Sequence, residues 1–407
     1  MIDIVKIYHY QLVAFSAIWL ILPRFSSILI ALLVLTTIIG AVKRKLHFIP
    51  NLTIYAMIML YGIYVMSLFV FGGWESGPKL LEYKLSFLIF PLILSYCPRN
   101  LSIVSIMRGH IIGCLILILI GFYHGLSCNA EFGDSFRCFS TTHFSQIHHP
   151  SYFSVFLILA SVILIFDSKN QIFKNEIIKL VVLTVTILVQ WNLGSLSGFV
   201  TIGVFCILLP VIYFIKTKKG KPLILTMVIS SIITAVFIFK SEEIKKDFEN
   251  AFENVQSYLN NPKEFVTYKS YIPKGNESRL ILWYASFQIC KDSPQGVGLG
   301  NLDVAMEKEL IALGHKKLAS KADNPHNQFL QITNHLGVFG LSIFLFLISY
   351  LLYKSIKYEN YILFSLMVSL FIFCMFESML ERQSGIVFFG LWIPLFSLFF
   401  NNKFTAE

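Results

Sequence analysis

The sequence predicts an all-α integral membrane protein with about twelve transmembrane helices and one large helical loop on the outer face. Of the 407 residues, 56% are hydrophobic and only 14% are charged, whereas soluble domains carry about a quarter charged residues. Apolar runs of the length needed to cross a bilayer, about 20 residues, recur along almost the whole chain. Only the stretch 241–325 interrupts this pattern.

Twelve apolar segments fit the template of a spanning helix. They lie near 8–22, 26–42, 52–71, 80–97, 103–126, 150–166, 177–191, 196–215, 222–240, 326–352, 360–376 and 384–401. Met1 to Tyr10 lead into the first segment without a small-residue cleavage site, so we expect this segment to be retained. An even number of spans places both termini on the same side.

The basic residues predict the orientation. With a cytoplasmic N-terminus, sixteen lysines and arginines fall in the inside segments and five in the short outside segments. Positive charge accumulates in short cytoplasmic loops, whereas long loops translocate largely regardless of charge. We therefore expect a multi-pass protein of the bacterial inner membrane with both termini cytoplasmic. The basic residues are scattered, so the net charge of +10 does not indicate a nucleic-acid partner.

This topology divides the chain into residues 1–240 with transmembrane helices 1–9, a loop at 241–325, and residues 326–407 with helices 10–12. The pattern within the loop predicts an amphipathic helix over Ser241–Asn260, a second helical stretch rich in large apolar residues over Gly275–Lys291, and a third short helix over Leu302–Leu313. Pro294–Asn301 contains three glycines and predicts a turn. Such helices either roof a cavity at the membrane surface or simply cover the bundle.

The cysteines and histidines do not indicate a metal site, because no cysteine pair has zinc-site spacing with histidines. Cys97, Cys114, Cys206 and Cys374 fall in apolar spans and are expected to be packing residues. Cys128 and Cys138 share one outside loop, where a disulfide is possible. The sequence leaves that pairing open.

The segment Asp323-Asn324-Pro325-His326-Asn327 opens the tenth span on the outer side. Asn324 suits an N-cap and Pro325 the first helical position, which would put His326 in the first turn. There the helix dipole disfavours imidazolium, and a neutral histidine can act as a general base. A helix start also favours phosphate. The alternative is a capping segment with an incidental histidine.

Further along the same span, Gly337 and Gly340 with Thr333 form a stripe of small residues that lets another helix approach closely. Asn327, Gln331 and Asn334 form a polar stripe, and polar residues inside spans are usually buried and often functional.

Other outside positions carry candidate charges. His149-Pro150 opens the sixth span after Arg137 and His143, and suggests a vestibule shared with His326. Arg279 starts the middle loop helix, and its planar guanidinium suits a phosphate. Lys84 lies at the outer start of the fourth span, and Arg382 precedes the twelfth, where it has Glu377 and Glu381 as possible partners. Each is also explicable as an ordinary interfacial residue.

His326-Asn327, nine further residues and then Gly337-Val338-Phe339-Gly340 resemble a signature of the O-antigen ligases, a family that shares its superfamily with the Wzy-type O-antigen polymerases. The layout is similar too, with about twelve spans and a large periplasmic loop before the histidine-bearing helix. His149–Ser154 and Glu377–Gln383 are similar to stretches of ligase-like members.

The resemblance implies inverting glycosyl transfer at the periplasmic face. The donor would be a glycan linked to undecaprenyl pyrophosphate, which lies among the membrane lipids. The acceptor would be a sugar hydroxyl of lipid A core. His326 would be the catalytic base and Arg279 would hold the pyrophosphate, with Asn327, His149 and Arg382 in support. No cofactor, metal or nucleotide is implied, because the donor is already activated.

One departure from the family concerns a second arginine, usual in a Ser-Arg-Gly-like stretch. The corresponding place reads Gly194-Ser195-Leu196-Ser197-Gly198 here. Arg137, Lys84 and Arg382 are the candidates to replace that arginine.

Three functions remain open at this stage. A ligase joins the glycan to lipid A core, and a polymerase extends it on its carrier. The third, a transporter of polysaccharide or lipid, usually shows internal repeats, of which we find no convincing example here. The His-Asn signature favours the ligase.

Overall fold

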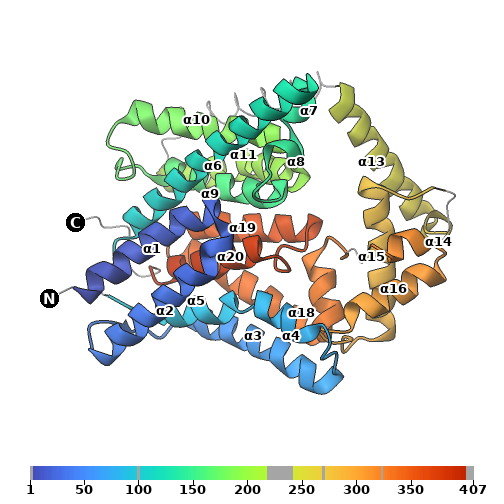
Figure 1. The fold of residues 1–407 in the computed structure, drawn as a ribbon, viewed down its shortest axis with the longest axis horizontal. Helices are drawn as coiled ribbons and strands as arrows, with labels where there is room; N and C mark the ends of the chain where they lie inside the picture. Colours follow the sequence, from blue (N-terminus) through green and yellow to red (C-terminus); the bar gives the residue numbers. More distant parts are fainter. Residues whose placement is uncertain (1–2, 99–100, 218–241, 268–270, 322–323, 400–407) are drawn as a thin grey trace.

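The computed structural model describes residues 3–98, 101–217, 242–267, 271–321 and 324–399 (Figure 1). Within these ranges, six helices are long and apolar enough to cross a membrane, and four shorter apolar helices accompany them. The all-α membrane fold class is thereby confirmed. The expected count of twelve is not, and the ninth expected span, 222–240, lies outside the described residues.

The first half of the chain forms helices close to the expected spans. They are α1 (Ile4–Ile21), α2 (Ser26–Val42), α3 (Leu52–Phe71), α4 (Gly77–Tyr83), α5 (Ser86–Ser95), α6 (Ile103–Phe132), α9 (Pro150–Phe166), α10 (Glu176–Leu193) and α11 (Leu196–Thr217). A short 3-10 turn η1 (Pro23–Phe25) joins α1 to α2, and the short helices α7 (Ser135–Cys138) and α8 (Thr141–Phe144) follow α6.

The fourth expected span differs from the prediction, because α4 and α5 replace a single helix over 80–97. The chain tightens at the junction, where the Leu85 N–H donates to the Glu82 carbonyl at 3.1 Å and the Phe87 N–H to the Lys84 carbonyl at 2.9 Å. Such three-residue bonds interrupt an α-helix. The break turns the Lys84 side chain into the protein, where it is 1% exposed.

The second half contains the loop helices and the last spans. The loop helices are α13 (Glu242–Asn260), α14 (Pro262–Phe265), α15 (Gly275–Asp292), α16 (Leu302–Ala312) and α17 (Lys316–Ala319), and the last spans are α18 (Gln328–Lys357), α19 (Tyr361–Phe376) and α20 (Gln383–Ser397). The three helices expected in the loop are confirmed in α13, α15 and α16. Figure 1 shows α13 to α16 gathered beside the start of α18.

Polar contacts between distant segments collect at two ends of the bundle. At one end, β1 (His47–Phe48) pairs antiparallel with β2 (Tyr96–Cys97), and Asn51 hydrogen-bonds to Ser397. At the other end, the link 377–382 between α19 and α20 meets the start of α18.

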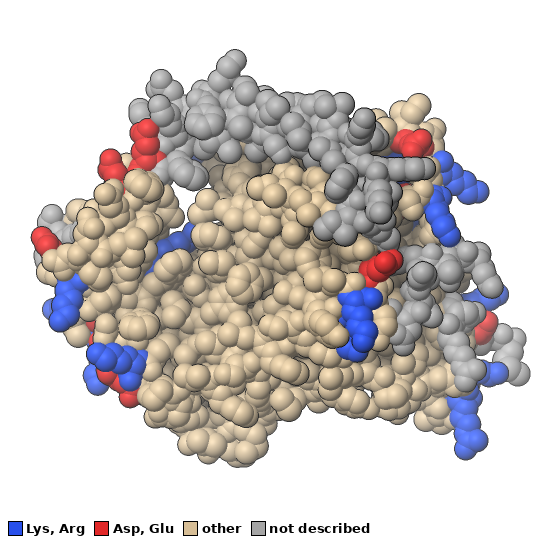
Figure 2. Space-filling view, turned by 180° about the vertical axis from the view of Figure 1, so that it is seen from behind, with Lys and Arg blue, Asp and Glu red and all other residues tan. Residues whose placement is uncertain are grey.

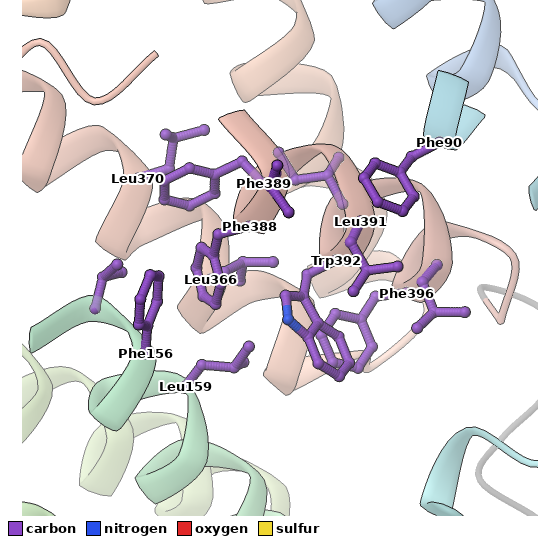
Figure 3. Close-up of a cluster of buried hydrophobic side chains, with 14 of the residues drawn as sticks. Phe90, Phe156, Leu159, Leu366, Leu370, Phe388, Phe389, Leu391, Trp392 and Phe396 are labelled. Atoms are coloured by element: carbon purple, nitrogen blue, oxygen red, sulfur yellow. The ribbon is translucent and has the colours of Figure 1, made fainter. Parts of the chain in front are cut away.

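The core surrounds α20, which is buried along almost its whole length. In Figure 3 the α20 aromatics Phe388 and Trp392 lie among Phe156 of α9, Leu366 of α19 and other apolar side chains. Figure 2 shows a broad outer surface of the molecule with few charged side chains, as a lipid-facing surface requires. A second apolar cluster forms within the loop, between α15 and α16.

A disulfide and a side-chain hydrogen bond fix two of the connecting segments. Cys128 at the end of α6 and Cys138 in α7 form a disulfide, which answers the pairing that the sequence left open. The turn after α15 docks on α3, where the Asn301 side chain donates to the Phe71 carbonyl at 2.9 Å.

Candidate functional site

His326 lies just before α18 rather than in its first turn. The N-cap is Asn327, whose side chain accepts hydrogen bonds from the Phe329 and Leu330 N–H groups at 3.0 and 3.1 Å. The prediction that Asn324 caps the helix was therefore wrong, and so was the helix-dipole argument built on it. Asn324 instead accepts a hydrogen bond from the His326 N–H at 2.9 Å, in a turn that precedes the helix. Asp323 lies outside the described residues.

The backbone of His326 is in the left-handed region, with φ of 47°. A side chain other than glycine pays a conformational penalty there, on the order of 1–3 kcal/mol, and such strain collects at functional sites. Neighbouring contacts hold the conformation. Trp283 of α15 donates from Nε1 to the Pro325 carbonyl at 2.7 Å, and the Asn327 amide donates to the Met375 carbonyl at 3.2 Å. The loop helix and α19 thus fix the histidine from both sides.

Glu377, directly after α19, is the partner of His326. Its Oε1 atom lies 2.8 Å from Nδ1 of His326, and the Glu377 side chain is only 7% exposed. Burial alone would raise the pKa of this carboxyl, but the hydrogen bond and charge of His326, with His149 and Arg279, lower the pKa below its usual value. An ionised carboxylate can only accept a hydrogen bond. Nδ1 of His326 therefore donates to Oε1 of Glu377, and Nε2 is the ring nitrogen left to exchange a proton.

Arg279 of α15 approaches the same carboxylate more loosely. Its Nη2 atom lies 3.7 Å from Oε2 of Glu377, beyond hydrogen-bond distance, and its side chain is 27% exposed. Oε2 is buried without a hydrogen-bond partner among the described residues. The guanidinium is thus oriented by the carboxylate while its N–H groups remain available to an anion.

His149 belongs to the same cluster, since the charges of Glu377, Arg382, His326 and Arg279 all act on it. It caps α9, and its ring accepts from the Ser151 N–H at 3.5 Å. Although the side chain reaches solvent, the protein around it lowers the pKa of His149 by desolvation, and the Glu377 carboxylate opposes this shift. Arg382 is exposed at the start of α20. The structure therefore brings His326, Arg279, Asn327, His149 and Arg382 together.

Lys84 and Arg137 occupy different surroundings. The Lys84 ammonium lies 2.7 Å from Oε1 of Glu381 and donates to the Leu380 carbonyl at 2.9 Å, and the side chain is buried. This geometry commits its charge to the protein and argues against contact with a pyrophosphate. Arg137 is exposed and donates from Nε to His143 at 3.3 Å within its own loop. No hydrogen bond or ion pair between described residues joins it to Glu377.

Gly337 interrupts α18 rather than serving as a small-residue contact for another helix. Its φ of 69° and ψ of −172° break the helix, and the turn after α15 fills the break. The Val297 and Gly298 N–H groups donate to the Asn334 and His335 carbonyls at 2.7 and 3.1 Å. The glycine is required because a Cβ would meet the backbone of Gln295. The His-Asn…Gly motif therefore marks a short helical half-segment with a bound turn at its end.

Sequence reasoning missed Glu377 and Glu381 as site residues. It considered them as partners of Arg382, but the described ion pairs join Glu377 to His326 and Arg279, and Glu381 to Lys84. Two acids in a short outer link between apolar spans were the available signal, because an unpaired carboxylate beside a bilayer is costly.

This fold and cluster define a multi-pass membrane protein with a histidine–carboxylate–arginine site beneath a helical loop. Residues 180–345 match a family model described as O-antigen ligase. The match confirms, for these residues, the resemblance to the O-antigen ligase family. The matched region covers less than half of the chain and includes Arg279 and His326, while Glu377 and His149 lie outside it. No curated protein matches the chain.

Proposed function

We propose that this protein is an O-antigen ligase that transfers a glycan from undecaprenyl pyrophosphate to a sugar hydroxyl of lipid A core at the periplasmic face. The observation that carries the proposal is the 2.8 Å contact between Nδ1 of His326 and the ionised Glu377. It orients the ring and leaves Nε2 as the proton acceptor, the arrangement that a hydroxyl nucleophile needs.

In this mechanism the acceptor oxygen attacks the anomeric carbon of the donor sugar while its proton passes to Nε2 of His326. The new glycosidic bond forms as the bond between that carbon and the pyrophosphate oxygen breaks, so configuration inverts. The bonding electrons leave with the pyrophosphate. Arg279 compensates the negative charge that develops there, and Glu377 stabilises the imidazolium.

Arg279 and Arg382 are the proposed cations for the pyrophosphate. Both act on His149 within the cluster, so Arg382 is the better placed of the three candidates for the family's second arginine. Arg137 is retained as a weaker candidate, because its contacts lie within its own loop. The disulfide between Cys128 and Cys138 supports an outer, oxidising location for this end of the protein.

The direct test is His326→Ala in a reconstituted assay with purified lipid-linked donor and lipid A core. Loss of a general base costs roughly 100- to 10,000-fold in rate, so we expect transfer to fall at least 100-fold while the protein remains folded. His47→Ala, an exposed histidine at the other end of the bundle, is the matched control and should transfer normally. Near-normal transfer by His326→Ala would refute the role of His326.

The polymerase is the second candidate, because it uses the same kind of donor and the family match covers both types. A gene deletion separates the two. Full-length polymer left on the lipid carrier with none attached to lipid A core indicates a ligase, whereas a single attached repeat indicates a polymerase.

A further inference from the structure

Two sets of polar contacts join the outer link 377–382 to the start of α18. At one end, Glu377 contacts His326 at 2.8 Å. At the other, Gln328 donates from Nε2 to Oε1 of Glu381 at 3.1 Å and accepts from the Leu380 N–H at 2.6 Å. Glu377 and Glu381 lie four residues apart on the link, and their partners His326 and Gln328 lie two residues apart at the start of α18.

Lys84 also contacts Glu381 and so stabilises the second set of contacts. Its ammonium lies 2.7 Å from the same Oε1 of Glu381 that Gln328 contacts, donates to the Leu380 carbonyl at 2.9 Å, and stands 4.7 Å from the centre of the Tyr64 ring. Gln328 is fully buried and Lys84 nearly so. A buried acid that loses its cation is left with an uncompensated charge, and its surroundings rearrange.

Burial would raise the pKa of the Glu381 carboxyl, but Lys84 and His335 lower the pKa, so Glu381 is held ionised. The Lys84 ammonium therefore binds two fixed groups, the Glu381 carboxylate and the Leu380 carbonyl. Both belong to the link that begins with Glu377.

We infer that Lys84 is a positioning residue that holds the link 377–382, and through it Glu377, in register with His326. The inference rests on the proposed function, in which His326 is the base and Glu377 its orienting partner. Lys84 does not touch substrate in this role. It supplies the buried counter-charge that lets the link present Glu377 at hydrogen-bond distance.

The role predicts a particular kinetic pattern. Displacement of a catalytic group by about 1 Å can cost about 100-fold in rate. Lys84→Met should therefore lower kcat by about 100-fold and change the KM for the lipid-linked donor less than about twofold, because no donor contact is lost. A phosphate-binding lysine would instead raise the donor KM.

The double variant Lys84→Met/Glu381→Gln separates positioning from loss of fold. A neutral pair removes the buried unpaired carboxylate, and replacing both partners is often tolerated where replacing one is not. We expect kcat to return to within about tenfold of the wild-type value. The double variant also tests the inference if Lys84→Met alone does not fold. A folded double variant as inactive as His326→Ala would overturn the inference.

Lys179→Met is the matched control, since Lys179 also donates to a backbone carbonyl in a link, that of Asp167 at 3.1 Å, away from this site. It should leave kcat and donor KM unchanged. If Lys179→Met loses as much kcat as Lys84→Met, both losses reflect general destabilisation and the inference is overturned.

A readout without turnover distinguishes the inference from the proposed function. If the wild-type protein transfers no glycan to lipid A core, the proposed function fails. Labelling of His326 by diethyl pyrocarbonate, followed by peptide mass spectrometry, still reports its hydrogen bond to Glu377. Lys84→Met, or the folded Glu381→Gln single variant, should slow labelling several-fold, because Nε2 of His326 loses the nucleophilicity that the Glu377 carboxylate gives it through Nδ1. An unchanged rate would overturn the positioning role.

Discussion

Nδ1 of His326 lies 2.8 Å from Oε1 of Glu377, although the two residues belong to different helix ends, one before α18 and the other after α19. Glu377 is buried and ionised, so the contact fixes both the ring orientation and its tautomer. In the proposed mechanism, this hydrogen bond makes Nε2 of His326 the atom that accepts the proton.

Replacement of Glu377 tests that conversion. Glu377→Gln keeps the shape of the side chain but removes the charge that stabilises the imidazolium, and we expect transfer to fall by about 100-fold or more. Initial rates at saturating donor and acceptor measure the effect. Glu82→Gln, at an exposed acid on α4, should behave like the wild-type protein. Full activity in Glu377→Gln would show that the carboxylate has no part in the reaction.

Arg279 should act on the donor rather than on the proton transfer. Loss of one charged donor at a developing anion costs about 100-fold, so Arg279→Ala should lower kcat/KM for the lipid-linked donor by about that factor. Arg279→Lys should recover only part, because an ammonium lacks the planar fork. Arg24→Ala, at an exposed arginine of η1, is the control. An unchanged donor kcat/KM in Arg279→Ala would remove Arg279 from the pyrophosphate site.

Much of the fold could be predicted because membrane helices can be identified from their apolar composition alone. Spans such as 52–71 and 150–166 coincide with α3 and α9, and the loop helix α13 follows from its amphipathic spacing. The partner of His326 could not be predicted, since Glu377 is 51 residues away and no periodicity links them. Lys84 misled for a different reason. A lysine at a span end usually extends its charge to water, whereas here a helix break turns it inward to Glu381.

The shifted carboxyl pKa of Glu377 predicts how stability depends on pH. Its folded-state pKa lies below the ordinary value of 4.5, so the unfolded state binds the proton first as pH falls. The stabilisation is complete above pH 4.5 and is lost as pH drops through the folded-state pKa. The difference in Tm between wild type and Glu377→Gln should therefore shrink as the pH falls below 4.5. A difference that already shrinks near pH 6 would contradict this.

Gly337 offers a test of the helix break that ends the first part of α18, the part that begins beside His326. Alanine at this position must adopt φ of 69° and place its Cβ against the backbone of Gln295. We expect Gly337→Ala to destabilise the protein by about 1–3 kcal/mol or more. It should also lower transfer, because the turn 294–298 is displaced from the carbonyls of Asn334 and His335.

The matched control for this change is Gly62→Ala within α3, where nothing lies within 4 Å of the added Cβ. Alanine is the better helix former by about 1 kcal/mol, so this variant should be as stable as the wild type or slightly more so. Thermal unfolding in detergent, measured side by side, compares the two. Equal Tm values for the two variants would mean that the break at Gly337 tolerates a side chain, and that the glycine of the His-Asn…Gly motif is not there for its backbone conformation.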